Sequence, residues 1–410
     1  PPPHPSTMVS SSAASDVYKR QGLLAAFLLA IAPLHVRYAQ EARMYSMLAF
    51  FSILSLYLFW RAVRVRSGCW WALFAAATAL NLYTHQFAFL SLGVTALFGL
   101  WLLVDGRARP QFPFRTWHFL AALAGICLSY LPMASFFLEG LTSEEGLGGS
   151  GPPAYGELTW SLASFSSAFR LFGGANDVGL PLYAGLCALA LVMLAVQQRT
   201  LLQHRTADPQ PDSALHIRTS RALALLALWM VLPLVIVLSI PTGPGVRIRY
   251  LLFLLPVFLL LVAYALDLVI LWAGSWLSGI HRSTTSPSSL QVPLTIAALG
   301  ILFVISLPSL ASYYAETKQN WRDATWMVQS SADAGDVLFV SRGHHRTGVL
   351  FYAQQWTQGE NPLTEENIRI LPKNPTEDLL PPNHNQAWLI VPLEEEYLPA
   401  GELDSMLRPH

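Results

Sequence analysis

The sequence predicts an all-α polytopic membrane domain of about nine transmembrane helices, followed by a small C-terminal α/β domain. The first observation behind this prediction is composition. Of the 410 residues, 53% are hydrophobic and 12% charged, whereas soluble domains are about 25% charged. The second is spacing, because apolar stretches of nearly membrane-spanning length recur up to residue 314 and then stop. Lys and Arg (25) balance Asp and Glu (25), which argues against a nucleic-acid partner and favours the lipid bilayer.

Nine stretches have the composition of membrane spans, which need about 17–25 mostly apolar residues. Two of them, the first and the third, are short. Residues 70–104 are interpreted as two helices that meet at residues 81–86, because the whole run is too long for one ordinary span. The predicted spans are residues 22–36, 44–60, 70–83, 87–104, 117–138, 180–196, 222–240, 250–272 and 292–314.

Arginine-rich loops predict the orientation of these spans, because short cytoplasmic loops carry an excess of Lys and Arg. The cytoplasmic side is expected to hold Arg61, Arg64, Arg66, Arg107, Arg109, Arg115, Arg199, Arg205, Arg218, Arg221 and Arg282. The extracytoplasmic side then holds residues 40–43, 83–86, 139–179, 241–249 and everything after residue 314. The segment at 139–179 is too long for a simple connector and is predicted to be an extracytoplasmic flap or binding loop.

The two ends of the chain carry different signals on either side of the membrane domain at residues 22–314. Residues 1–21 lack a basic start followed by an apolar core, so they resemble neither a signal peptide nor a span. Residues 11–21 look like a stray translated segment from the broken end of a metagenomic chain, so a non-native or disordered stretch is expected. Residues 315–410 are predicted to form a small extracytoplasmic α/β domain, with a helix at 321–331 and buried strands at 336–340 and 387–391.

Charges at span ends on the arginine-poor face are the candidate functional residues. A helix that continued through HVRYAQEARMY would place Arg37, Glu41 and Tyr45 on one stripe, with Arg43 pointing elsewhere. This arrangement permits a Glu41–Arg37 ion pair and leaves Arg43 free to bind an anion. The alternative is a purely structural ion pair at the interface, with Tyr38 and Tyr45 as aromatic anchors.

A second pair of arginines precedes the eighth predicted span. Arg247 and Arg249 follow a Pro-Gly turn together with Tyr250, and they suit a guanidinium fork that holds a lipid phosphate at headgroup level. Snorkelling to the interface would explain one such arginine, less easily two. His85 lies at an extracytoplasmic hairpin, where it either hydrogen-bonds a substrate or only caps the end of its helix.

Three other titratable residues are assigned no chemistry. Asp267 is about 25 Å along a helix from Tyr250, so it is expected to be a solvated helix end. His344 and His345 have no acidic residue or cysteine at metal-ligand spacing and are expected to be surface imidazoles.

Several segments, in their order along the chain, resemble a known family. They resemble bacterial polytopic glycosyltransferases of the GT-C superfamily, similar to dolichyl-phosphate-mannose–protein mannosyltransferases and aminoarabinose lipid A transferases. The resemblance covers the chain from about residue 22 to residue 352. The segments are RYAQEARMYSML (37–48), NLYTHQFAFLSL (81–92), RYLLFLLPVFLLL (249–261), NWRDATWMV (320–328) and AGDVLFV (334–340).

This resemblance implies an inverting transfer of a sugar, from a polyprenyl-phosphate donor to an extracytoplasmic protein, lipid or glycan, in a bacterial inner membrane. Such a reaction needs a carboxylate that deprotonates or orients the acceptor and cations that stabilise the phosphate leaving group. Glu41 is the expected catalytic carboxylate. The expected substrate-binding residues are Arg37, Arg43, Tyr45, His85, Arg247, Arg249 and Tyr250.

The resemblance also marks what the sequence leaves open. The family's principal acidic residue stands in a loop between two N-terminal spans that this sequence does not contain, so a truncated chain with little or no activity is expected. No cofactor is assigned, and a divalent cation stays an open alternative. A lipid-linked sugar transporter or flippase would share the architecture and the arginines, but repeated halves with broken helices are not found. A non-catalytic scaffold would not need Arg43, Arg247 and Arg249 on this face.

Overall fold

The computed structural model describes residues 19–105, 112–135, 138–139, 179–203, 211–239, 248–280, 287–315, 320–333, 336–340, 343–355, 363–371 and 386–390. Predictions for residues 1–18, for residues 140–178 of the expected flap and for Arg247 lie outside the described residues. The chain divides into two compact units, Pro1–Tyr313 and Tyr314–His410.

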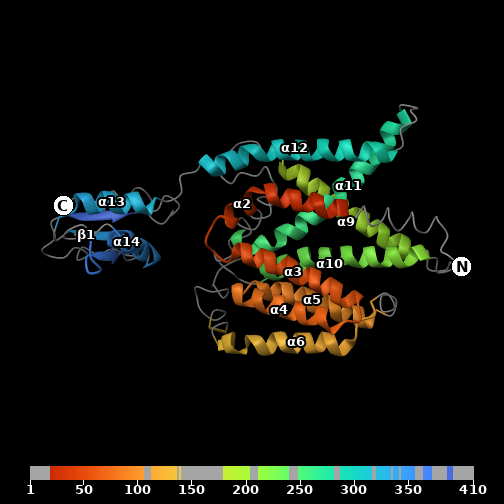
Figure 1. The fold of residues 1–410 in the computed structure, drawn as a ribbon, viewed down its shortest axis with the longest axis horizontal. Helices are drawn as coiled ribbons and strands as arrows, with labels where there is room; N and C mark the ends of the chain where they lie inside the picture. The colour runs from red at the N-terminus through yellow and green to blue at the C-terminus, as the bar shows by residue number, and fades with distance from the viewer. Residues whose placement is uncertain are drawn as a thin grey trace. The chain divides into compact units, whose positions relative to one another are not determined.

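The described part of the first unit is built from helices (Figure 1). It begins with a helix at Lys19–Ile31, which Pro33 ends because a proline cannot continue the hydrogen-bond ladder. The next helices along the chain are α2 (Pro33–Ala39), α3 (Tyr45–Arg64), α4 (Gly68–Thr84), α5 (Ala88–Val104), α6 (Thr116–Tyr130), η2 (Leu131–Met133), α9 (Gly179–Gln203), α10 (Pro211–Ser239), η4 (Ile248–Leu254), α11 (Leu255–Ile280) and α12 (Pro287–Ala315).

Helices lie along all nine predicted spans, but not all of them are long and apolar enough to cross a membrane. Five described segments are long and apolar enough to cross a membrane. They are Tyr45–Arg64, Thr116–Met133, Ser220–Ser239, Arg249–Ser278 and Leu290–Ala315. The pair Lys19–Ile31 and α2, bent by 65°, is a sixth candidate if it is one broken span. α5 has 17 residues, or about 26 Å of helix, so by itself it is shorter than the ~30 Å hydrocarbon core.

α3 is central to the packing of the first unit. It contacts α2, α4, α5 and η4, and its Phe59 ring lies 5.5 Å from Phe74 and 6.0 Å from Trp71 of α4. α6 approaches α5 closely, since a Cβ on Gly99 would lie 2.6 Å from Cζ of the buried Phe119. Small residues permit such close approach between apolar helices, which associate by van der Waals packing.

A buried polar network joins α3, α4 and α5. Asn81 Nδ2 donates to Ser52 Oγ at 3.0 Å, and Ser52 Oγ lies 3.2 Å from Ser91 Oγ. Hydrogen bonds between small polar side chains hold apolar helices in register. One helical turn from Ser52 and Asn81, the hydroxyls of Ser55 and Thr78 are buried without a hydrogen-bond partner within the described residues.

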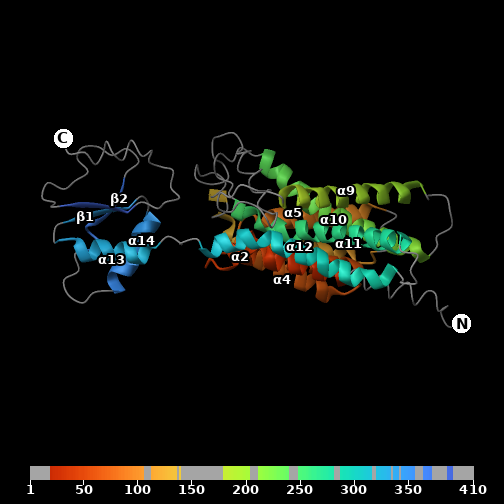
Figure 2. The same ribbon diagram turned by 90° about the horizontal axis from the view of Figure 1, so that it is seen from above.

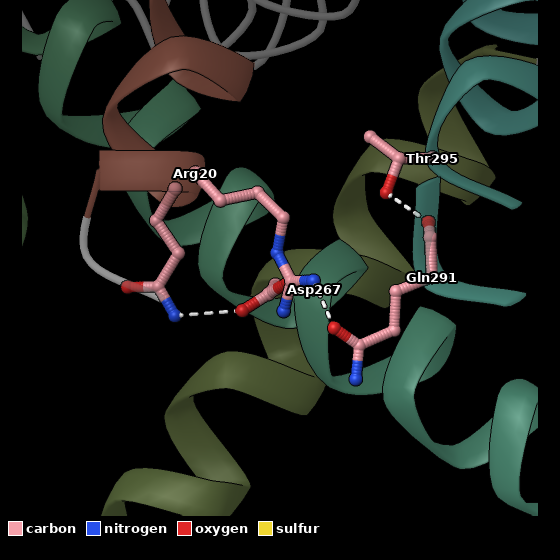
Figure 3. Close-up of polar contacts among 5 residues, drawn as sticks. Arg20, Asp267, Gln291 and Thr295 are labelled. Carbon is pink, nitrogen blue, oxygen red and sulfur yellow. Dashed lines mark hydrogen bonds and ion pairs between the residues drawn. The ribbon is translucent and has the colours of Figure 1, made fainter. Parts of the chain in front are cut away.

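The first described helix contributes a buried ion pair (Figure 3). Arg20 Nη2 lies 2.6 Å from Asp267 Oδ1 of α11, and Gln21 Nε2 donates to Asp267 Oδ2 at 3.1 Å. Arg20 also donates to Gln291 Oε1 of α12 at 2.8 Å. The prediction that Asp267 is a solvated helix end is wrong, because its side chain is 0% exposed and these partners replace water. This helix begins at Lys19, so residues 19–21 of the expected non-native segment belong to the described fold.

The second unit has α/β structure. Its described strands form a parallel sheet in the order β2 (Ile368–Ile370), β1 (Val337–Val340), β3 (Ala387–Ile390). Two helices, α13 (Trp321–Ser331) and α14 (Gly343–Gln355), lie on one face of this sheet (Figure 2). The predicted helix at 321–331 and the predicted strands at 336–340 and 387–391 are confirmed, whereas β2 was not predicted.

Two buried polar residues stabilise the second unit. The Asp336 carboxylate accepts hydrogen bonds from the Gln386 backbone N–H at 2.9 Å and from Trp388 Nε1 at 3.0 Å, which fixes β3 beside β1. His345 stacks on Trp321 with ring centroids 4.7 Å apart. The prediction that His345 is a surface imidazole is wrong, because it is only 7% exposed and packs on this ring. The side chain of His344 lies outside the described residues.

Candidate anion-binding site

The connection between α2 and α3 carries the first group of candidate charges. α2 ends at Ala39, and the chain turns through residues 40–44 before α3 begins. Glu41 lies between two arginines: its Oε1 is 3.9 Å from Arg37 Nε, and its Oε2 is 4.0 Å from Arg43 Nε. At these distances, and partly exposed, the two ion pairs are weak.

The sequence predicted this group only in part. The Arg37–Glu41 pair is confirmed, because α2 and its end keep the spacing of four residues. The predicted single stripe that includes Tyr45 is wrong, because the helix stops at Ala39 and Tyr45 begins a new one. Arg43 is not free of Glu41, although its side chain stays 53% exposed and accessible to a ligand.

Arg249 brings the second group of charges to the start of α3. It lies in η4, which packs against α3, and its Cζ is 5.6 Å from the ring centroids of both Tyr45 and Tyr250. Its Nε is buried and has no hydrogen-bond partner in the part of the chain that the structure describes. A buried guanidinium N–H without a partner is costly. Within the described residues, Arg249 therefore keeps one buried N–H donor that is unsatisfied.

An aromatic cluster surrounds Arg249. We define it as Tyr38, Tyr45, His85, Phe87 and Tyr250. Tyr45 is its centre, with ring centroids 5.6 Å from Tyr38, 5.9 Å from His85 and 5.9 Å from Tyr250. His85 and Phe87 lie 5.2 and 5.4 Å from Tyr250. The cluster joins the end of α2, the start of α3, the α4–α5 turn and η4 in one place.

His85 is held in this cluster by its own backbone turn. Its N–H donates to the Asn81 carbonyl at 3.3 Å, which closes the end of α4. Its Nδ1 accepts the Phe87 backbone N–H at 3.1 Å. Burial, and next the positive charge of Arg249, lower the pKa of His85 from 6.5 to about 4. The imidazole is therefore neutral at pH 7.

The charges around the cluster are unbalanced. Tyr38 lies within electrostatic reach of Arg37, Glu41 and Arg249, and Tyr45 within reach of Arg43 and Arg249. The described residues of this region thus include three arginines and one carboxylate. Such an excess of positive charge favours an anionic ligand.

Most of the predicted site residues meet in this region, with one exception. Arg37, Glu41, Arg43, Tyr45, His85, Arg249 and Tyr250 belong to it, while Arg247 lies outside the described residues. Sequence reasoning missed Phe87, whose only signal is its position two residues after His85 in a hairpin. It also missed Tyr313 at the end of α12, which donates to Gln40 Oε1 at 3.1 Å.

A divalent cation does not fit the described part of this region. No group of three or more His, Cys, Asp or Glu that could hold a metal ion occurs in the described ranges. Glu41 is the one carboxylate that the described residues place here, and a divalent cation such as Mg²⁺ prefers several oxygen ligands. The donors of this region are guanidinium N–H groups, tyrosine hydroxyls and the imidazole of His85, and they suit an anion instead.

No protein-family model matches this chain, and a comparison with curated proteins finds no match. The function of the protein must therefore be inferred from its helices and from the charges around Tyr45.

Proposed function

We propose that this protein is an integral-membrane glycosyltransferase that moves a sugar from a polyprenyl-phosphate donor to an extracytoplasmic acceptor. One observation carries the proposal: the buried Nε of Arg249 has no described partner, in a region where arginines outnumber carboxylates. The ligand that fits is anionic. Since Arg249 also begins a segment long and apolar enough to cross a membrane, a phosphate attached to a lipid tail would reach it from the bilayer.

The proposed chemistry uses Arg249 and Glu41 in different roles. An oxygen of the acceptor attacks the anomeric carbon of the donor sugar, and the bond from this carbon to the phosphate oxygen breaks. The electron pair leaves with the polyprenyl phosphate, whose developing charge Arg249 stabilises by charge-assisted hydrogen bonds. Glu41 accepts the acceptor's proton or orients its hydroxyl. Arg37 and Arg43 lie on either side of the Glu41 carboxylate, at 3.9 and 4.0 Å.

The opposite end of the bundle supports the proposed orientation. Arg61 lies 4.8 Å from the Trp70 ring and Arg64 lies 5.9 Å from the Trp60 ring, where α3 ends and α4 begins. Arginines beside tryptophans are typical of a membrane interface. Short arginine-rich loops are typical of the cytoplasmic side. The proposed site lies at the other ends of these helices and is therefore assigned to the extracytoplasmic face.

The proposed topology has nine spans. Beyond the five segments that meet the length and hydropathy criteria, we assign as spans the bent helix pair that ends at Ala39, α4, α5 and α9. α4 and α5 would cross together with their flanking residues, because α4 packs against the spanning helices α3 and α6. The second unit then lies outside the cytoplasm of a bacterium, at its inner membrane.

A transfer assay tests the proposed function. The purified protein in proteoliposomes is incubated with a panel of radiolabelled polyprenyl-phosphate sugars, with the matching nucleotide sugars as the comparison. Incubations last hours, so that slow transfer is also detected. We expect label in an acceptor from at least one lipid-linked donor and none from nucleotide sugars.

Two variants assign the role of Glu41 in this assay. Glu41→Gln keeps the shape but removes the base, so transfer should fall while donor binding changes little. Glu366→Gln, an exposed carboxylate of the second unit, is the matched control and should transfer at the wild-type rate. Transfer from nucleotide sugars, or a donor affinity that is unchanged in Arg249→Gln, would contradict the proposal.

A further inference from the structure

The hydrogen bonds of His85 determine which of its ring nitrogens carries the proton. The Phe87 backbone N–H donates to Nδ1 at 3.1 Å, so Nδ1 acts as an acceptor and carries no proton. A neutral imidazole has one N–H, which is then on Nε2. His85 is therefore fixed by the α4–α5 turn as a hydrogen-bond donor at Nε2.

The groups that face the His85 ring favour this neutral form. They are Tyr45 from α3, Arg249 and Tyr250 from η4, and Phe87 from its own turn. None of these groups is a carboxylate, and the charge of Arg249 opposes a second positive charge beside it. The ring is partly exposed, and among the described residues none accepts a hydrogen bond from Nε2.

We propose that His85 donates a hydrogen bond from Nε2 to an oxygen of the phosphate group that Arg249 binds. Both side chains border the same two rings, Tyr45 and Tyr250. Arg249 supplies the charge, and His85 supplies a neutral donor of fixed direction. His85 thereby positions the phosphate group. This inference rests on the proposed function and assigns His85 a role beyond closing its own turn.

Two substitutions separate ligand binding from a purely structural cap. In His85→Asn the side-chain oxygen replaces Nδ1, so the contact with the Phe87 N–H is kept and the distal donor is lost. In His85→Gln the side-chain amide nitrogen replaces Nε2, so the distal donor is kept and the cap is lost. A ligand-binding role and a capping role therefore predict opposite results.

The experiment measures the affinity of the purified, detergent-solubilised chain for a polyprenyl-phosphate sugar. We expect His85→Gln to bind within about threefold of the wild type, and His85→Asn to bind about tenfold or more weakly, as is typical of a lost hydrogen bond to a charged group. The reverse order, equal losses in both variants, or no loss in either would overturn the proposal. Because the donor is a phosphodiester with no second titration, wild-type affinity should also be constant from pH 8 to pH 5.5.

Further arms distinguish this inference from the proposed function and identify the source of the phosphate. If Arg249→Gln leaves the affinity unchanged, the proposed function itself fails. If Arg249→Gln abolishes binding but the two His85 variants do not differ, only the role of His85 fails. Competition by inorganic phosphate alone would assign the site to a free anion, and competition by phosphatidylglycerol added to the detergent micelles would assign it to general lipid headgroups. Either result would overturn recognition of the lipid-linked donor.

Discussion

Acidification should destabilise the fold through His85, and the structure gives the direction and the pH window. The pKa of His85 is lowered from 6.5 to about 4 by burial and by Arg249. The folded protein therefore binds fewer protons at this site than the unfolded chain does between these two pH values. Stability is fully present above about pH 6.5 and is lost as the pH falls towards 4.

The magnitude of this loss comes from the same two values. Each pH unit in the window costs about 1.4 kcal/mol per proton, so 2.5 units give an upper bound of about 3.5 kcal/mol. Because the ring is partly exposed, we expect a loss of about 1–3 kcal/mol, after allowance for solvent screening.

The assay is reversible unfolding in mixed detergent micelles, followed by tryptophan fluorescence at pH values from 8 to 4. The wild type is compared with His85→Gln, which cannot titrate, so that the difference between their free energies of unfolding isolates His85 from every carboxylate. On acidification, the wild type should lose about 1–3 kcal/mol more of its free energy of unfolding than His85→Gln does. A difference that stays constant within about 0.5 kcal/mol over the whole range would refute the burial of a neutral imidazole.

Three further predictions concern the packing of the first unit and use the same unfolding measurement. Gly99→Ala should destabilise by about 1–3 kcal/mol through overpacking, whereas Gly93→Ala, with open space around its Cβ position, should not; equal effects would contradict the close helix contact. Arg20→Gln should cost about 3 kcal/mol by leaving a buried carboxylate unpaired, and adding Asp267→Asn should recover most of that loss; no recovery would show that the pair does not form. Thr78→Val should be neutral or stabilising because it removes an unsatisfied buried hydroxyl, and a clear loss of stability would mean that this hydroxyl has a partner.

Much of the fold could be predicted from sequence because it depends on local patterns. The position of each membrane-domain helix follows from its apolar run, and α13, β1 and β3 follow from periodicity and turn residues. β2 was missed because a strand of three residues with a central arginine has no periodic signal of its own. It becomes a strand only because it pairs with β1.

The sequence predicted which residues belong to the candidate site, but it did not predict how they are arranged in space. The spacing of Arg37 and Glu41 predicted their contact, because the two residues are four apart, and the contact forms although the helix ends at Ala39. The position of Arg43 depends on the turn after Ala39, which no periodic pattern in the sequence predicts. The burial of Asp267 could not be predicted for a different reason: its partner Arg20 is far away in sequence, and a buried charge is tolerated only where tertiary structure supplies such a partner.

The most direct test of the central claim is a structure of the protein with a polyprenyl-phosphate sugar bound. We predict phosphate oxygens at charge-assisted hydrogen-bond distance, about 2.7–2.9 Å, from the Arg249 guanidinium, with the sugar directed towards Glu41 and the prenyl chain in the bilayer. Donor density that lies elsewhere, for example at the arginine-rich end beside Arg61 and Arg64, would contradict the assignment of this site.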